Sequence, residues 1–207
     1  LEQELGEESL KEYTQIIINE ADRLQNLMNR MLTPHQMPVY KKTNIHEILE
    51  RVRSLILSEF SSDITFIRDY DVSLPEFIVD REKLIQAILN IAKNGAQAMK
   101  LNNQDNMQLS FITRAERQIV FRKKKHATAI RIDIIDNGPG IKNELIDKIF
   151  FPLVTGKENG SGLGLSLSQN LISLHQGMID CHSVPGKTVF SIILPIENNL
   201  MLTKEKK

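Results

Sequence analysis

The sequence predicts an α+β fold, a two-layer α/β sandwich in which a mixed sheet carries its helices on one face, preceded by one long helix. Three observations lead to this prediction. Residues 10–32 contain neither Gly nor Pro and repeat apolar side chains at helical spacing. Beyond residue 43, helical and strand-like segments interleave along the chain. Several strand-like segments follow one another as hairpin neighbours, which favours a mixed sheet over a doubly wound parallel one.

The first predicted helix has a heptad-like apolar seam. One helix cannot bury such a seam alone, so it should pack against another helix, from this chain or from a partner. The alternative is a helix that docks on the globular part. Pro34 and Pro38 end the pattern, and residues 34–42 are interpreted as a linker. The seam consists of Leu10, Tyr13, Ile17, Leu24, Leu27 and Met31.

Residues 43–197 form the predicted globular domain, and residues 198–207 a C-terminal tail. A first helix runs from the capping pair Asn44 and Glu47 to about residue 60, and a second from the N-cap Asp80 to about residue 99. Strands are predicted over 64–70, 107–113, 118–122, 127–135, 178–182 and 188–194, and further helices over 143–149 and 161–175.

Composition excludes several classes of protein. The 207 residues include 26 Lys and Arg and 26 Asp and Glu, so no net charge draws the chain to nucleic acid or to an anionic membrane. No apolar run reaches membrane-spanning length. The single cysteine, Cys181, lies in an alternating segment that predicts a small buried side chain. We expect a cytoplasmic protein, and a chain that begins at Leu1 suggests a piece of something longer.

Two glycine clusters carry the chemistry of this sequence. The first is Asp136-Asn137-Gly138-Pro139-Gly140, and the second, after a short irregular stretch, is Gly160-Ser161-Gly162-Leu163-Gly164-Leu165. A Walker loop would need Ser or Thr after Gly156-Lys157, where Glu158 stands. A Rossmann fingerprint would need a strand directly before Gly160, where a loop is predicted.

The first cluster suits an adenine base. An ionised Asp136 offers only hydrogen-bond acceptors, which match the adenine amino group and not the carbonyl at the corresponding edge of guanine. ATP is therefore favoured over GTP. Gly138 and Gly140 let the backbone approach the base without an intervening Cβ.

The second cluster and a pair of asparagines suit phosphates. The glycines at 160, 162 and 164 leave backbone N–H groups free to face phosphate oxygens at the start of a helix. Asn90 and Asn94 are four residues apart and share a helix face beside apolar positions. Asn94, a neutral oxygen donor, can hold a Mg²⁺ that keeps most of its waters. The alternative is that both amides hydrogen-bond loop backbone.

Four segments, in this order, resemble sequence boxes of the sensor histidine kinases. They are residues 89–96 for the N box, 136–140 for the G1 box, 150–153 for the F box and 160–165 for the G2 box. Residues 11–14, 20–24, 67–71 with 74–76, and 152–158 are similar to the nitrogen-regulation branch of this family. The resemblance spans about residues 10–196. It implies a Bergerat-type ATP-binding fold, with residues 1–33 as the second helix of a dimerisation and histidine-phosphotransfer hairpin.

The resemblance also implies roles for single residues. Asn94 would hold Mg²⁺, and Lys157, in the presumed lid, would neutralise charge on the transferred phosphoryl group; the alternative is a solvated lysine. Asn90 stands where related gyrase-type ATPases have a glutamate that activates water. An amide cannot accept that proton, so the γ-phosphoryl group is kept for another acceptor. The other implied nucleotide contacts are Asp136, Gly138, Gly140, Ile141, Gly160, Gly162, Leu163, Gly164, Leu165 and Thr188.

No histidine of this sequence matches the acceptor of the family. His46-Glu47 lacks the proline of the family's histidine box and opens a helix of the globular domain. The remaining histidines fall in linker, strand or turn contexts. The resemblance therefore implies that the acceptor lies upstream of Leu1 and that this piece binds ATP without phosphorylating itself. Those remaining histidines are His35, His126, His175 and His182.

Partners follow from the same resemblance. It implies a homodimer through the helical hairpin, transfer to a response regulator of NtrC type, and dephosphorylation of that regulator under control of a PII signalling protein. Two other functions remain open: a protein-serine kinase of the anti-sigma type on the same fold, and a module that binds ATP without transferring it. The basic run over residues 122–126 is interpreted as a solvated hairpin turn and not as a nucleic-acid site.

Overall fold

The computed structural model describes residues 14, 37–60, 64–121, 124–156 and 160–196. The chain divides into two units, Leu1–Pro38 and Val39–Lys207, and the following concerns the second. The predicted helix over residues 10–32, apart from Thr14, lies outside the described residues, as do Lys157 and the predicted tail. Within the described ranges, no helix is long and apolar enough to cross a membrane.

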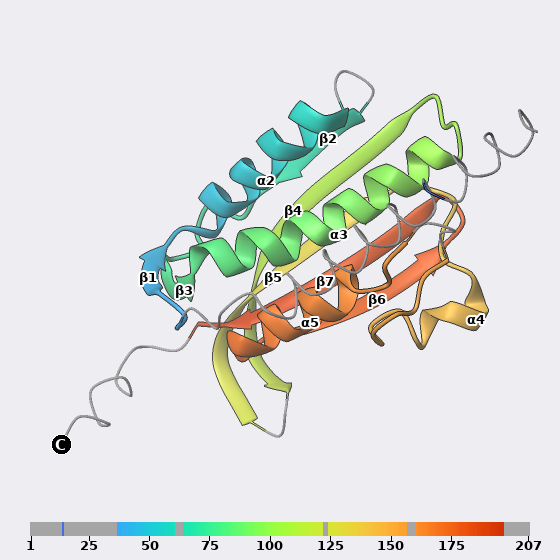
Figure 1. Cartoon of the computed structure of the whole chain (residues 1–207). Coiled ribbons are helices and arrows are strands. Elements are labelled where there is room, and N and C mark those ends of the chain that lie inside the picture. Colours follow the sequence, from blue (N-terminus) through green and yellow to red (C-terminus); the bar gives the residue numbers. More distant parts are fainter. Residues whose placement is uncertain (1–13, 15–36, 61–63, 122–123, 157–159, 197–207) are drawn as a thin grey trace, which may run out of the picture. The chain divides into compact units, whose positions relative to one another are not determined.

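A five-stranded mixed sheet forms one layer of the second unit (Figure 1). Its strand order is β2-β4-β5-β7-β6. β2 runs parallel to β4, and the other neighbours are antiparallel. The strands span Ile64–Asp69 (β2), Met107–Phe121 (β4), Lys124–Asp136 (β5), Met178–Val184 (β6) and Lys187–Pro195 (β7).

Three helices form the second layer and cover one face of this sheet (Figure 1). They are α2 (Ile45–Phe60), α3 (Arg81–Leu101) and α5 (Gly164–Leu174), and the short α4 (Asn143–Ile146) follows β5. The apolar stripes of the helices meet the inward side chains of the strands in one core that includes Ile48, Leu84, Ile88, Leu109, Phe111, Ile132 and Ile192. The predicted α+β class, a mixed sheet with helices on one face, is confirmed.

The predicted helix starts at Asn44 and Asp80 are confirmed by their hydrogen bonds. Asn44 Oδ1 accepts from the His46 N–H at 2.8 Å, and Asp80 Oδ1 accepts from the Lys83 N–H at 3.1 Å. Each side chain satisfies a backbone donor that the first turn of a helix leaves unpaired. Sequence-local capping therefore fixes where α2 and α3 begin.

Two predicted boundaries were wrong. The predicted linker, residues 34–42, contains most of β1 (Tyr40–Thr43), which pairs with β3 (Phe77–Asp80) in a separate two-stranded sheet. The helix predicted from residue 161 begins at Gly164, because Gly162 has a φ of +63°, outside the helical region.

The strands predicted over 107–113 and 118–122 are one strand, β4. Beyond Ile112 its pairing with β2 ends, and the part of β5 before Ala129 does not pair with β7. The outer parts of β4 and β5 therefore continue as a two-stranded arm (Figure 1). Since an arm covers no core, its residues need not alternate between apolar and polar, and the pattern of β4 appears interrupted.

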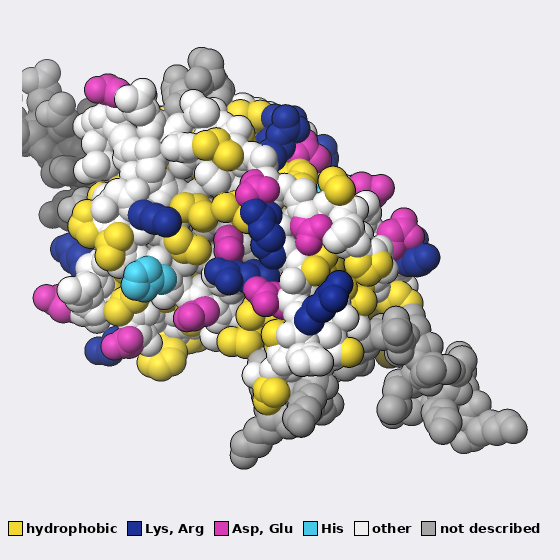
Figure 2. Space-filling model, turned by 180° about the vertical axis from the view of Figure 1, so that it is seen from behind, with side chains coloured by type: hydrophobic (Ala, Val, Ile, Leu, Met, Phe, Trp, Pro, Cys, Tyr) yellow, Lys and Arg dark blue, Asp and Glu magenta, His cyan; other side chains and the backbone are white. Residues whose placement is uncertain are grey.

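On the face of the sheet turned away from the helices, pairs of oppositely charged side chains lie among hydrophobic side chains (Figure 2). Arg114 of β4 is paired with Asp69 of β2, and Arg131 of β5 with Asp133 at 3.0 Å and Glu116 at 3.7 Å. These pairs are solvated to a large extent, so each contributes little to the stability of the fold.

Candidate functional site

Asp136 is the last residue of β5 and lies between Leu109 of β4 and Thr188 of β7. Its carboxylate is buried, and Oδ1 accepts a hydrogen bond from the Gly138 N–H at 3.0 Å. Burial raises the pKa of Asp136, and the Gly138 bond opposes this shift in part. One oxygen of the carboxylate is thus fixed by its own loop, which orients the other.

Gly95 of α3 lies directly against this carboxylate. It was not among the site residues predicted from the sequence. A Cβ added at Gly95 would lie 2.9 Å from Asp136 Oδ2, and one added at Gly138 would lie 3.2 Å from Met99 Cγ. The two glycines therefore let α3 and the Asp136 loop approach closely. The available signal was a glycine inside an otherwise continuous helix, which weakens the helix unless something packs there.

Ile141 and Thr188 are brought together through Ser183, a third residue that the sequence did not suggest. The Ile141 N–H donates to Ser183 Oγ at 2.9 Å, and Ser183 Oγ lies 2.9 Å from Thr188 Oγ1. Gly140, with a φ of +84°, lies so close to the Val184 backbone that an added Cβ would be 3.0 Å from its carbonyl. The first glycine cluster is therefore held between the ends of β5, β6 and β7.

The second glycine cluster forms the approach to α5. The carbonyl of Gly162 accepts a hydrogen bond from the Leu153 N–H at 3.0 Å, and a Cβ added at Gly162 would clash with the Leu153 backbone. Gly160 and Leu163 are half-buried, and Leu165 packs against the core. Leu163 is the N-cap of α5, and its apolar side chain makes no capping hydrogen bond to this helix.

Asn90 and Asn94 of α3 face this start of α5. Asn90 Nδ2 donates to the Gly164 carbonyl at 3.5 Å, and a Cβ added at Gly164 would lie 3.8 Å from Asn94 Nδ2. The bond of Asn90 to backbone is of the kind that the alternative interpretation of these amides predicts. Both side chains are half-buried, so α3 contributes two amides at the N-terminus of α5.

Two other reactive side chains are Cys181 of β6 and His46 of α2. Cys181 is half-buried rather than buried, and burial raises the pKa of its thiol to about 12, so it stays protonated. His46 opens α2 as predicted, stacks on Tyr70 with ring centroids 4.7 Å apart, and its Nε2 lies 3.1 Å from Thr113 Oγ1.

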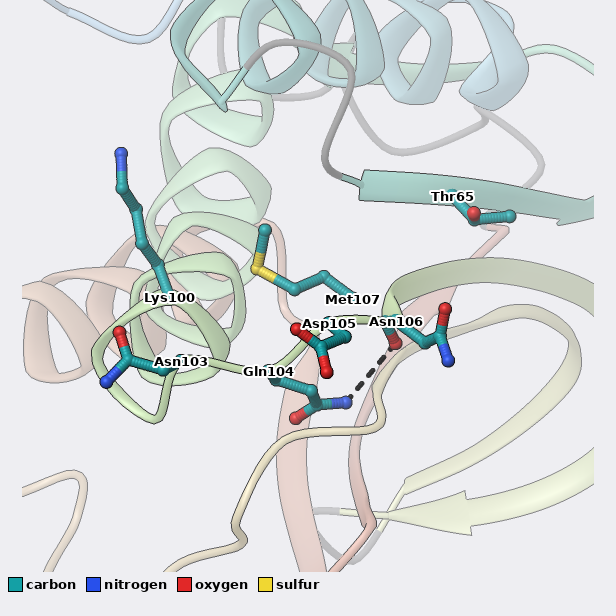
Figure 3. Close-up of a pocket in the computed structure, with 7 residues that line it drawn as sticks. All are labelled: Thr65, Lys100, Asn103, Gln104, Asp105, Asn106 and Met107. Atoms are coloured by element: carbon teal, nitrogen blue, oxygen red, sulfur yellow. Dashed lines mark hydrogen bonds between the residues drawn. The ribbon is translucent and has the colours of Figure 1, made fainter.

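A cavity of about 550 Å³ lies at the end of α3 and shares no lining residue with the predicted site (Figure 3). Its lining is polar, and its Gln104 donates to the carbonyls of Asn106 at 3.3 Å and Asn137 at 3.0 Å. The loop between α3 and β4 thereby anchors the residue that follows Asp136. The lining residues are Thr65, Lys100, Asn103, Gln104, Asp105, Asn106 and Met107.

Residues 79–198 match the family model described as histidine kinase-, DNA gyrase B- and HSP90-like ATPase. This range contains both glycine clusters and both asparagines. The chain belongs to this ATPase family.

Within it, sensory histidine kinases/phosphatases NtrB match nearly the whole chain. The protein of Vibrio alginolyticus is 47% identical over 196 residues, which cover 95% of this chain and 55% of that protein. The protein of Escherichia coli O157:H7 is 44% identical over 197 residues, again 95% of this chain and 55% of the other. The predicted likeness to nitrogen-regulation sensor kinases is confirmed, and the chain spans about half the length of these curated relatives.

Solved histidine kinases share the fold. The catalytic domain of histidine kinase ThkA superposes with a TM-score of 0.60 at 24% identity, over 76% of this chain and 96% of that one. A structure of ShkA in complex with AMPPNP has a TM-score of 0.63 at 20% identity, over 89% of this chain and 38% of that one. ThkA in complex with the response regulator protein TrrA has a TM-score of 0.62 at 24% identity, over 91% of this chain and 52% of that one.

Proposed function

We propose that this domain binds ATP with Mg²⁺ between α3, α5 and the residue 136–140 loop, and donates the γ-phosphoryl group to a histidine of the intact protein. The observation that carries the proposal is that one helix, α3, contacts both a buried carboxylate and the start of α5. Gly95 of α3 contacts Asp136, and Asn90, little more than a turn earlier, contacts Gly164. The proposed binding sites for adenine and for the phosphates therefore both lie against α3.

The carboxylate end fits adenine. Since Gly138 occupies Asp136 Oδ1, an acceptor remains for the exocyclic amino group of the base. The shielded position of this carboxylate makes such a bond stronger than it would be in water. Ile141 and Thr188 are then candidate contacts beside the base.

The glycine end fits phosphates and a magnesium ion. The first-turn N–H groups of α5 and the positive end of its dipole favour an anion there. A ligand set of Asn94, phosphate oxygens and waters is typical for Mg²⁺ in phosphoryl-transfer sites. Among the described residues no group of three His, Cys, Asp or Glu side chains could hold a metal ion, which agrees with a cation brought in by the nucleotide. Lys157 completes the proposed set from outside the described residues.

The remaining organisation is proposed from the relatives. We propose that residues 1–33 belong to a dimerisation hairpin, that residues 34–38 are a linker, and that the acceptor histidine lies on the partner helix of that hairpin. A response regulator of NtrC type would receive the phosphoryl group, and a PII signalling protein would control its dephosphorylation. The ThkA complex with TrrA offers support for a regulator as partner. A cytoplasmic location fits these roles.

The test combines the chain with a separately produced helical hairpin that bears a histidine box of an NtrB relative. Mg²⁺ and ATP labelled in the γ-phosphoryl group are added, and acid-labile label on the hairpin is measured. We expect label on the hairpin and none on this chain. ATP binding without any label would favour the ATP-sensing module, and label on a serine of an added protein the anti-sigma type kinase.

A second outcome follows from Asn90. An amide cannot act as a general base at neutral pH, so water bound at this position is not activated. We predict steady-state ATP hydrolysis far below about 1 per second, the lower end of ordinary enzyme turnover. A phosphate-release assay checks this, and turnover at ordinary enzyme rates would contradict the role proposed for Asn90.

A further inference from the structure

α3 and α5 run side by side in opposite directions, and two hydrogen bonds between the helices and a third between the residues that flank their far ends join them. Asn90 Nδ2 donates to the Gly164 carbonyl at 3.5 Å, at the end nearest the candidate nucleotide site. Ser168 Oγ donates to the Ala87 carbonyl at 3.0 Å, one turn further along α5. At the far end, the Asp80 N–H donates to His175 Nε2 at 3.0 Å.

His175 can make its far-end bonds in one protonation state only. Nε2 accepts from the Asp80 N–H, so it carries no proton, while Nδ1 lies 2.8 Å from the Leu171 carbonyl and must donate. The ring is therefore neutral, with its proton on Nδ1. The side chain is buried, with 9% of its surface exposed, so an unmade hydrogen bond here is not replaced by water.

Residues at the start of β1 contact Asp80 and His175 as well. The Val39 N–H donates to Asp80 Oδ2 at 2.9 Å, and the Tyr40 hydroxyl donates to the Leu174 carbonyl at 3.2 Å. The edge of the Tyr40 ring also meets His175, with centroids 5.9 Å apart. Asp80 thus contacts β1 and His175 while it caps α3, the helix that carries both asparagines.

We propose that His175 is a positioning residue for the nucleotide site, because it fixes the far ends of α3 and α5 to each other and to β1. The relative position of these two helices sets the separation between the Asn90 and Asn94 amides and the start of α5. This inference rests on the proposed function of the site. It adds a residue that touches neither nucleotide nor metal and that belongs to none of the sequence boxes.

Protonation of the ring opens this contact. A proton on Nε2 would face the Asp80 N–H, so two donors would meet, and the bond would be lost. Burial lowers the pKa of His175, although the Leu171 carbonyl and the Asp80 carboxylate act in the opposite direction. In the described residues, the titratable groups that face the ring are Asp80 of β3 and Tyr40 of β1. The contact is therefore intact at neutral pH, and it opens only below the ordinary histidine pKa near 6.5.

The experiment uses the whole chain, with His175→Ala, His175→Gln and the control His182→Gln, which changes an exposed histidine of β6. Dissociation constants for Mg-ATP are measured by calorimetry at about pH 8 and about pH 5, because the lowered pKa of His175 places its protonation below the ordinary histidine value near 6.5. We expect His175→Ala to weaken binding by about tenfold at the higher pH, within the usual range for coupled sites. Glutamine can accept from Asp80 and donate to Leu171 without titrating, so His175→Gln should weaken binding less and flatten the pH dependence.

His182→Gln should follow the wild-type chain at both pH values. Wild-type affinity in His175→Ala, or an unchanged pH dependence in His175→Gln, would overturn the positioning role. Nitrogen-15 NMR of the histidine rings provides a readout that needs no nucleotide. We expect the signal that disappears in His175→Gln to show the proton on Nδ1, and a proton on Nε2 would overturn the proposal. If the wild-type chain binds no Mg-ATP at all, the proposed function fails, while the NMR result still decides whether the hydrogen bonds exist.

Discussion

Asp136 shows how the surroundings of a single residue assign different tasks to its two carboxylate oxygens. Oδ1 is bound by Gly138 within the same loop, and Oδ2 lies beside Gly95 of α3. The sequence identified Asp136 as a hydrogen-bond acceptor for a base, because it stands directly before a glycine cluster. It missed Gly95, because a glycine inside a helix indicates a close contact but not its partner, and Asp136 lies 41 positions further along the chain.

The first prediction concerns the substitution Asp136→Asn. The side-chain oxygen of asparagine would take the Gly138 bond, which turns its NH₂ group toward the adenine amino group, so two donors would meet. We expect the dissociation constant for ATP to rise by about tenfold to a hundredfold, because an unpaired buried polar group costs about 1–3 kcal/mol. Calorimetric titration with ATP and Mg²⁺ measures it.

Asp133→Asn is the matched control for this prediction. Asp133 lies on the same strand and is bonded to Arg131 and Ser191 on the opposite face of the sheet. Its substitution can lower the stability of the fold but should leave nucleotide affinity within about twofold, since the two sites share no contact. Equal affinity of Asp136→Asn and the wild-type chain would refute the adenine assignment.

Helices and strands were predicted from the sequence when the residues that stabilise them lie close together in the chain. The helices α2 and α3 were predicted well, since their apolar stripes and the caps at Asn44 and Asp80 are contained in the sequence of each helix. β1 and β3 were missed because they are short and because their pairing joins Tyr40 to Asp80 across the whole of α2 and β2. No pattern within four residues reveals such a partner.

The element α2 is also tied to β2 by a cluster that the sequence did not suggest. The Tyr70 hydroxyl donates to Glu50 Oε1 at 3.0 Å, and Glu50 Oε2 receives Arg53 at 2.9 Å. Although burial alone would raise it, these bonds lower the pKa of Glu50, and burial together with Glu50 raises that of Tyr70. A half-buried hydroxyl on a charged acceptor should contribute more to stability than an exposed one on a carbonyl.

We therefore predict that Tyr70→Phe lowers the free energy of unfolding by about 1–2 kcal/mol. Tyr40→Phe is the matched control, because it also removes one hydroxyl, here an exposed one bonded to the Leu174 carbonyl. Its loss should be under about 0.5 kcal/mol, in keeping with a bond that water can replace. Urea unfolding of both variants measures the difference, and equal losses would show that the Glu50 cluster is not a special contact.

For the whole molecule, stability in mild acid depends on groups at two separate points. His46, at the start of α2, and His175, at the end of α5, both have pKa values lowered chiefly by burial. Glu50, Asp69 and Asp71 have lowered pKa values, and hydrogen bonds hold them ionised. The pKa of Asp136 is raised, chiefly by burial. Each shift contributes to the pH dependence of folding in a definite direction.

The histidines and the carboxylates affect stability in different pH ranges. A histidine with a lowered pKa binds its proton less readily when folded, so stability is complete above its ordinary value near 6.5 and falls as the pH drops below it. The carboxylates with lowered pKa values lose their contribution only below their ordinary range, near pH 4. Asp136 acts in the opposite direction, because protonation is favoured in the folded state. Between about pH 7.5 and pH 5 the two histidines with lowered pKa values should therefore make stability fall as the pH falls, and the raised pKa of Asp136 opposes this fall.

The last prediction is that the unfolding free energy of the wild-type chain falls between about pH 7.5 and pH 5, and that it falls less in a His46→Gln, His175→Gln double variant. Glutamine keeps a hydrogen-bonding group at each position and does not titrate, so the two proton uptakes of the unfolded state disappear. Urea unfolding at several pH values, without nucleotide, measures both slopes, and His182→Gln should keep the wild-type slope because His182 is exposed. If the double variant keeps that slope as well, the acid sensitivity arises elsewhere in the chain, and the burial of these two rings does not control it.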